Sequence, residues 1–379
     1  MIGAMPASLL TAMPTASPLS ERIRAAALHN QSQLADERTG FVRNAWYVAA
    51  LASEVGREPL ARRLLDVPVL LYRRLDGTAV ALEDRCAHRS FPLSRGRIDG
   101  DTVVCGYHGA RYGADGRCLQ VPSQAQVPPG AVVRAFALHE VGPWLWIWLG
   151  DPAAADPGLV PRAPWMQDPG WTASTDRLHL RASYVRLHEN LLDLTHLSFL
   201  HANTFGTPDY ATAPFETRLD EAVGHFSLLR SVSPTRLPPL WALPTGLDGV
   251  DAARVVESSF LSPALHVVAV KFYACHLPEA EQPSRAIRTA HIVTPETATR
   301  THYFIQHARN FALTDTEMTG FMHTQLRKAF QEDVDGLEAI ETLLGQYPER
   351  QPEISFQADR ASLAMRRYLL RQAEAERAG

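Results

Sequence analysis

Two short cysteine–histidine pairs are the part of this sequence with the clearest capacity for chemistry. The first pair is Cys86 and His88, and the second, after sixteen intervening residues, is Cys105 and His108. Each pair lies at or beside a predicted turn. Paired loops that each carry one thiolate and one imidazole can enclose a metal centre. Chance is a poor explanation for two such pairs in one small domain, so we predict a metal site here.

Two kinds of metal centre fit these residue types. A structural zinc site is one alternative, but zinc fingers usually pair Cys with Cys and His with His. The alternating order fits a Rieske [2Fe–2S] cluster better, because one of its irons takes both thiolates and the other takes both imidazoles. Such a cluster suits the transfer of single electrons to an oxygen-activating site. We predict four cluster ligands, Cys86, His88, Cys105 and His108, and two ordinary buried cysteines, Cys118 and Cys275.

A second group of polar residues interrupts an apolar segment with helical spacing. It consists of Asn190, Asp193, His196 and His201. Two histidines and one carboxylate with open positions form the facial triad of non-haem Fe(II) oxygenases. On an ideal helix His196 and His201 point about 140° apart, so the helix must end or distort between them if both bind one metal. The alternative is a set of core histidines with satisfied hydrogen bonds.

The elements around these groups predict two domains. From Phe41 to Asp151, short apolar runs separated by turn signals are typical of a small antiparallel barrel or sandwich. Five prolines between Gly150 and Gly170 then mark a boundary. Further elements follow it: a helix within 183–200, strands within 255–276 and 286–307, and helices over 314–345 and 357–378.

The expected fold class is therefore α+β. A β-rich [2Fe–2S] domain over 39–155 precedes a mixed α+β catalytic domain over 156–379, which has a central antiparallel sheet flanked by helices. Residues 1–38 are predicted to be a weakly ordered N-terminal extension.

The bulk composition excludes several classes of protein. The 379 residues are 46% hydrophobic and 21% charged, which is ordinary for a folded chain. The net charge of −4 offers no electrostatic footprint for nucleic acid, and no apolar run is long enough to span a membrane. Residues 1–20 lack Lys and Arg and contain three prolines, unlike a secretory signal. We expect a cytoplasmic protein, with an organelle-targeting segment as the alternative.

Both motifs together resemble those of Rieske non-haem iron oxygenase α subunits, from about Phe41 to Ile340 and into 357–360. The segments 41–48, 147–152 and 291–297 look specifically like the vanillate and dicamba O-demethylase group. The resemblance implies that His196 and His201 bind a mononuclear Fe(II) with a distant Asp. We take this to be Asp333, with Asp335 and Glu332 as rivals. It also implies that Asp193 bridges His108 and His196 between subunits of a homotrimer, with Asn190 near the iron.

The function implied by this resemblance is that of a monooxygenase component in aromatic compound catabolism. With O2 and electrons it would hydroxylate or O-demethylate an aromatic small molecule bearing methoxy or carboxyl groups. No G-x-G-x-x-G occurs, so NAD(P)H must act through a separate reductase, with or without a ferredoxin. Ring dihydroxylation, N-demethylation and alicyclic hydroxylation are alternatives, as is a Rieske electron carrier without oxygenase chemistry. Four substrate-binding candidates are proposed: His291, Phe205, Phe272 and Gln325.

Overall fold

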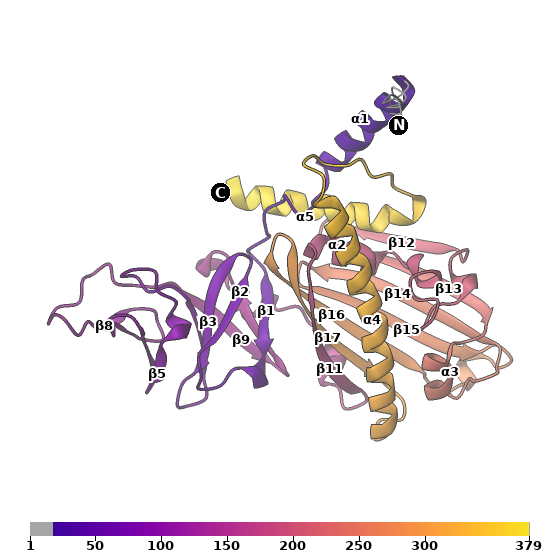
Figure 1. Cartoon of the computed structure of the whole chain (residues 1–379). Helices are drawn as coiled ribbons and strands as arrows, with labels where there is room; N and C mark the ends of the chain where they lie inside the picture. Colours follow the sequence, from indigo (N-terminus) through magenta and orange to yellow (C-terminus); the bar gives the residue numbers. More distant parts are fainter. Residues whose placement is uncertain (1–17, 379) are drawn as a thin grey trace, which may run out of the picture.

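The computed structural model describes residues 18–378, in which three antiparallel sheets and five α-helices form two packed domains (Figure 1). The first domain holds two sheets. The larger has six strands, in the order β1 (Trp46–Leu51), β10 (Trp144–Trp148), β9 (Ala135–Val141), β4 (Ala79–Glu83), β3 (Val67–Arg73) and β2 (Leu60–Leu64). The smaller has four strands: β5 (Arg97–Asp99), β6 (Thr102–Val104), β7 (Arg111–Tyr112) and β8 (Cys118–Gln120).

The second domain is organised on a seven-stranded antiparallel sheet. Its order is β11 (Thr172–Leu180), β17 (Arg300–Arg309), β16 (Ala286–Thr297), β15 (Leu265–Ala274), β14 (Ala252–Ser262), β13 (His225–Thr235) and β12 (Phe215–Asp220). Along β14, every second side chain from Ala252 to Phe260 is buried. This period of two is the pattern of a strand with one face on a core.

Four helices pack against this sheet. They are α2 (Tyr184–Leu192), α3 (Pro239–Thr245), α4 (Thr316–Leu344) and α5 (Arg360–Ala378). Helix α4 begins at its N-cap Asp315, whose carboxylate accepts from the Met318 amide at 2.9 Å. Its buried stripe includes Leu326, Phe330 and Val334, four residues apart, and faces the sheet. Figure 1 shows α4 crossing one face of the sheet, which places the buried stripe of this helix between the helix and the sheet.

The two domains share a continuous core. Trp144 packs against Phe304 with ring centroids 5.9 Å apart. Two hydrogen bonds cross the junction, from the Thr294 hydroxyl to the Val48 carbonyl at 2.8 Å and from the Leu65 amide to the Pro295 carbonyl at 2.8 Å. The first domain is therefore fixed against strands β16 and β17 of the large sheet.

The predicted fold class is confirmed, while the domain boundaries at 39, 155 and 156 remain predictions. The expectation of a weakly ordered extension is wrong for Pro18–Ser32, which forms helix α1. This helix contains three alanines at 25–27 and has the acidic Glu21 in its first turn, and both features favour a helix. Residues 1–17 lie outside the described residues. The expectation of buried leftover cysteines is also wrong, since Cys118 is half-buried and Cys275 is exposed.

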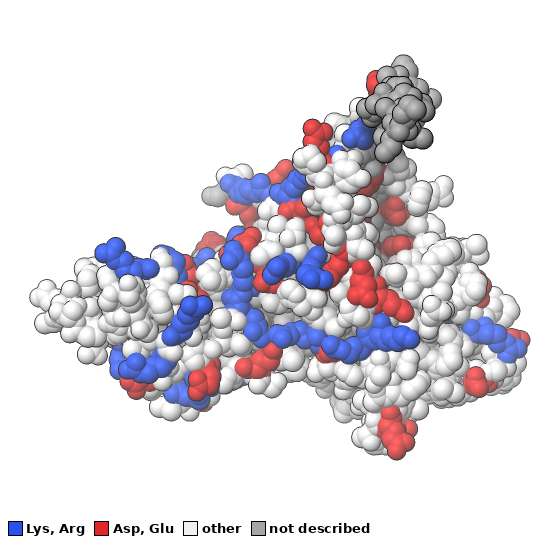
Figure 2. Space-filling view, in the orientation of Figure 1, with Lys and Arg blue, Asp and Glu red and all other residues white. Residues whose placement is uncertain are grey.

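The surface agrees with the modest net charge. Figure 2 shows acidic and basic side chains interspersed over the face that it presents. Among the described residues, no helix has the length and apolar content that a membrane span requires.

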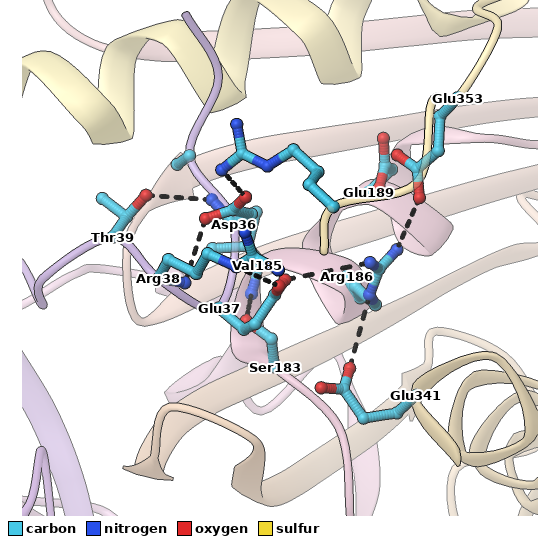
Figure 3. A network of polar contacts seen from close by, with 12 residues as sticks. Asp36, Glu37, Arg38, Thr39, Ser183, Val185, Arg186, Glu189, Glu341 and Glu353 are labelled. Atoms are coloured by element: carbon cyan, nitrogen blue, oxygen red, sulfur yellow. Dashed lines mark hydrogen bonds and ion pairs between the residues drawn. The ribbon is translucent and has the colours of Figure 1, made fainter. Parts of the chain in front are cut away.

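A partly buried charge network ties residues 35–37 to helices α2, α4 and α5 (Figure 3). The Arg186 guanidinium of α2 lies 3.4 Å from Glu341 of α4, 3.4 Å from Glu353 and 3.9 Å from Glu37. Next to it, Arg366 of α5 donates to the Ala35 carbonyl at 2.8 Å. One arginine thus compensates three carboxylates from separate parts of the chain.

We expect Arg186→Met to lower the free energy of unfolding by about 2–4 kcal/mol, because it leaves the partly buried Glu341 without a cation and weakens the pairing of Glu37 and Glu353, which then keep Arg38 and Arg366 respectively. Urea denaturation measures the change. The matched control is Arg38→Met, since the Arg38 side chain is 51% exposed beside Glu37 and its loss should cost under about 1 kcal/mol. Equal effects of the two substitutions would contradict the role given to Arg186.

Candidate functional site

The two cysteine loops repeat one backbone pattern. In the first loop the Cys86 amide donates to the Phe91 carbonyl at 2.9 Å, and the Ser90 amide donates back to Cys86 at 2.9 Å. The second loop has the same two bonds around Cys105, at 2.8 and 3.0 Å, with Gly109 in the place of Ser90. Ser90 and Gly109 both have positive φ, 56° and 75°. The loops are therefore conformational copies that present their side chains in the same way.

All four predicted cluster ligands lie together at these loops. Cys86 and Cys105 are each 2% exposed, and burial, together with the neighbouring Cys86 thiol, raises the pKa of Cys105. His88 and His108 are exposed, with their Nδ1 atoms 3.2 Å apart. Two buried sulfurs beneath two exposed imidazoles match the donor set of a Rieske cluster, one iron to each kind of ligand.

Tyr112 is a residue of this site that the sequence analysis missed. Its hydroxyl oxygen accepts a hydrogen bond from the Ala87 amide at 3.2 Å and lies 3.3 Å from the Cys86 Sγ. The hydroxyl proton is therefore free to donate to that sulfur. Hydrogen bonds to cluster sulfurs tune the reduction potential. No local spacing signals this contact, because Tyr112 reaches Cys86 only through the pairing of β6 and β7.

The second group lies where α2 ends. Ser183 caps the start of this helix by accepting from the Val185 amide. The helix ends at Leu192, and the Asp193 side chain accepts from the Thr195 amide at 2.7 Å, a turn that competes with helical continuation. The predicted helix over 183–200 is therefore too long. It ends before both histidines, so His196 lies in a short 3₁₀ turn and His201 in the following loop.

Three of the predicted metal ligands converge. The Asp333 Oδ1 atom of α4 lies 3.1 Å from His201 Nε2 and 3.5 Å from His196 Nε2. Asn190 Nδ2 donates to the same oxygen at 3.1 Å. The two imidazole nitrogens and the carboxylate oxygen all lie within 4.8 Å of one another, and His201 and Asp333 are buried. This donor set fits a facial triad.

The far sides of both histidines are held by carboxylates. His196 Nδ1 lies 3.5 Å from Asp193 Oδ2, and His201 Nδ1 lies 2.9 Å from Glu332 Oε2. Thr204 donates to this Glu332 oxygen at 2.7 Å, a support that the sequence analysis also missed. Such contacts fix the ring orientation and the tautomer of metal-binding histidines, and here they direct both Nε2 atoms to one point.

These contacts separate the acidic candidates for a third ligand. Glu332 faces the outer nitrogen of His201, and the exposed Asp335 accepts from Gln331 on the far side of α4. Of the three, only Asp333 faces both histidines.

The electrostatics of the group favour a bound cation. Burial opposes a charged His196, but hydrogen bonds and Coulomb attraction from Asp193 and Asp333 outweigh it and raise the pKa of His196 to about 9. Burial likewise opposes a charged Asp333, yet the two histidines hold its pKa below the ordinary range. Asp193 and Asp333 therefore stabilise a positive charge at the buried imidazole that lies between them.

Another histidine–carboxylate group meets the same distance criterion: His179, Glu296 and His302. His179 pairs with Glu296, and His302 Nε2 donates to the Arg63 carbonyl at 3.0 Å across the domain junction. His179 is exposed, and all three side chains already have protein partners, so this group serves as a junction contact.

A small cavity of about 60 Å³, partly open to solvent, adjoins the buried group. His291 and Phe205, two of the substrate candidates, line it, and the Phe205 ring stacks on His201 with centroids 4.4 Å apart. Phe272 lies behind the wall, against Trp241, and Gln325 is outside the lining although Leu326 is within it. The cavity is mostly apolar, and its few polar lining residues include the histidines, Asp333 and Arg254.

Asp193 and His108 are not joined within one chain. Among the described residues, Asp193 contacts Thr195 and His196, whereas His108 contacts His88 and Tyr107. The bridge that was predicted between them remains a prediction about subunits.

Both parts of the chain match known families. Residues 45–136 match the Rieske [2Fe-2S] domain, and residues 180–375, about half of the chain, match the Vanillate O-demethylase oxygenase C-terminal domain. The chain belongs to the Rieske oxygenases. The family resemblance predicted from the two motifs is confirmed. The match of the second domain favours an oxygenase over an electron carrier.

Relatives of this Rieske oxygenase agree over most of its length. It is 38% identical over 87% of its length to a putative toluene-4-sulfonate monooxygenase iron-sulfur subunit of Comamonas testosteroni, covering 96% of that protein. It is 36% identical to the dicamba O-demethylase oxygenase component of Stenotrophomonas maltophilia, over 79% of this chain and 88% of the relative. Dicamba monooxygenase bound to 3,6-dichlorosalicylic acid superimposes with a TM-score of 0.81 at 31% identity, covering 90% of this chain and 100% of the other.

Gly206 allows the loop that carries both histidines to close. Its amide donates to the His201 carbonyl at 2.9 Å, and a Cβ at this position would lie 1.7 Å from the Leu197 carbonyl oxygen. We expect Gly206→Ala to force the loop open and weaken Fe(II) binding at least about tenfold, with the cluster absorption unchanged. Metal titration of the purified protein measures this.

The control for that experiment is Gly320→Ala in α4, where a Cβ would meet no atom within 4 Å. It should bind Fe(II) as the unsubstituted protein does. Full Fe(II) affinity in Gly206→Ala would show that the loop geometry does not govern the site.

Proposed function

We propose that this Rieske oxygenase is the terminal component of a monooxygenase system that hydroxylates or O-demethylates an aromatic small molecule. The observation that carries the proposal is the convergence of two imidazoles and one carboxylate at the edge of an apolar cavity. Relatives named for vanillate, dicamba and toluene-4-sulfonate support an aromatic substrate. Relatives named as oxygenase components support a separate NAD(P)H-dependent reductase.

The residues fit both metal centres. Cys86 and Cys105 would hold one iron of the cluster and His88 and His108 the other, while the mononuclear iron would take His196, His201 and Asp333. A solved dicamba monooxygenase with non-heme iron, 29% identical with a TM-score of 0.73, supports this. When bound, these centres supply single electrons and O2 activation. The protein orients the imidazoles through Asp193 and Glu332, holds the aromatic ring between apolar walls and limits the access of water.

We further propose a homotrimer in which Asp193 of one subunit accepts a hydrogen bond from His108 of the next. Two observations support this. His88 and His108 are exposed, and the Asp193 side chain is 30% exposed while it still holds His196. A carboxylate shared by two imidazoles would give a short path for electrons between subunits. The expected location is the cytoplasm.

The proposed function is tested by product analysis. The purified chain, a surrogate reductase, NADH and O2 are incubated with methoxybenzoates, other aromatic acids and N-methyl compounds. We expect O2-dependent release of formaldehyde from a methoxylated aromatic acid, together with its demethylated product. A cis-diol would instead assign ring dihydroxylation, and formaldehyde only from N-methyl compounds would assign N-demethylation. Absence of any O2-dependent product across the panel would contradict the proposal.

The bridging role of Asp193 predicts a selective defect in Asp193→Asn. The amide oxygen can still accept from the Thr195 amide, so the turn survives, but the negative charge beside His196 is lost. Turnover should fall about 100-fold while the iron content and cluster absorption stay normal. The exposed Asp335→Asn is the matched control and should turn over normally. Normal turnover by Asp193→Asn would rule out the bridge.

A further inference from the structure

Arg254 is a buried cation in the wall of the cavity. It lies on β14, is 2% exposed and lines the same cavity as His201 and Asp333. Its Nη1 donates to the Phe205 carbonyl at 3.0 Å. Three aromatic rings surround the guanidinium, with centroids at 5.0 Å for Tyr210 and 5.8 Å for both Phe205 and Trp241.

This guanidinium has no carboxylate partner. Within residues 18–378, Arg254 forms no ion pair with an Asp or Glu, and its Nε is buried without a hydrogen-bond acceptor. The acid whose charge reaches it, Asp209, lies beyond ion-pair distance. Buried charges in proteins are normally paired, because removing an unpaired charge from water is strongly unfavourable. A side chain in this state, facing a ligand cavity, lacks an anion that a ligand can supply.

The position of Arg254 is also suitable for orienting a substrate. Its guanidinium contacts the Phe205 ring, and that same ring stacks on His201. A ligand that pairs with Arg254 therefore shares an aromatic wall with the histidine group. The planar guanidinium edge matches a planar oxyanion such as a carboxylate, and it can also bind a sulfonate.

We propose that Arg254 is the residue that binds the anionic group of the substrate, so that this oxygenase selects aromatic carboxylates or sulfonates over neutral aromatics. The proposal rests on the proposed function, since it assigns the substrate class of that same cavity. Arg254 is a specificity residue in this account. It fixes one end of the ring, and the methyl or methoxy group at the other end is directed to the metal ligands.

Arg230 on the neighbouring strand separates this role from a purely structural one. It too is 2% exposed, donates to a carbonyl, that of Tyr210 at 2.7 Å, and lies over aromatic rings with its Nε unpartnered. Unlike Arg254, it does not line the cavity. The absence of a carboxylate partner alone therefore does not mark a ligand site, whereas its combination with the cavity does. Arg230→Gln is the matched control.

The test measures binding by calorimetry with two pairs of probes of similar shape. These are toluene-4-sulfonate with toluene-4-sulfonamide, and 3-methoxybenzoate with 3-methoxybenzamide. For the full chain with both metal centres, we expect at least one anion to bind about 10- to 100-fold more tightly than its neutral counterpart. The better anion assigns sulfonate or carboxylate. Arg254→Gln should abolish this preference without weakening the neutral probe, and Arg230→Gln should retain it.

If Arg254→Gln does not fold, Arg254→Lys replaces it. A lysine cannot hold the Phe205 carbonyl and an oxyanion together, so the anion affinity should still fall about tenfold. The proposal is wrong if the unsubstituted protein prefers neither anion over its neutral counterpart, or if the preference is unchanged after substitution of Arg254. Product assays on the same preparations separate the two proposals. If O2-dependent product forms but the preference for the anionic probe does not depend on Arg254, only the anion site is contradicted. If the preference depends on Arg254 but no O2-dependent product forms, only the proposed function is contradicted.

Discussion

The contact on which this molecule depends is the convergence of His196, His201 and Asn190 on one oxygen of Asp333. It joins the end of α2 to the middle of α4, more than 130 residues later in the chain. A buried carboxylate is stable only when its oxygens are hydrogen-bonded, so the sheet, α2 and α4 must all be in place for the site to exist. The apolar stripe of α4 and the cap at Ser183 therefore act on the chemistry indirectly, by fixing where these side chains meet.

The first domain places its redox residues by a different means. Two loops with the same hydrogen bonds bury the cysteines and leave the histidines at the surface, where another protein can approach them. The second domain does the opposite, since it buries its ligand group beside a cavity. In the proposed trimer, the exposed histidines of one subunit would lie against Asp193 of the next and so reach the buried group.

Much of this was predictable from the sequence because the key residues are local. The two cysteine–histidine pairs and the spacing of His196 and His201 predict both centres, and period-two patterns predict the region of β14 to β17 in the large sheet. The other three strands of that sheet, β11, β12 and β13, were not predicted. The end of α2 was placed too late, because the Asp193 turn competes with helix propensity at short range. Tyr112, Thr204 and Arg254 could not be found in this way. Each acts through a partner brought close only by strand pairing or loop closure, and Arg254 is notable for a missing carboxylate, which no sequence pattern records. Gly206 is similar, since its role is visible only once the Leu197 carbonyl lies against it.

The central claim is that His196, His201 and Asp333 bind iron independently of the cluster. The most direct measurement is the iron content per chain of anaerobically purified protein, with the cluster absorption recorded on the same sample. The account predicts about three iron atoms per chain, of which two belong to the cluster. Asp333→Asn should retain about two with unchanged cluster absorption, while the exposed Asp335→Asn retains all three. Two iron atoms in the unsubstituted protein, or three in Asp333→Asn, would contradict it.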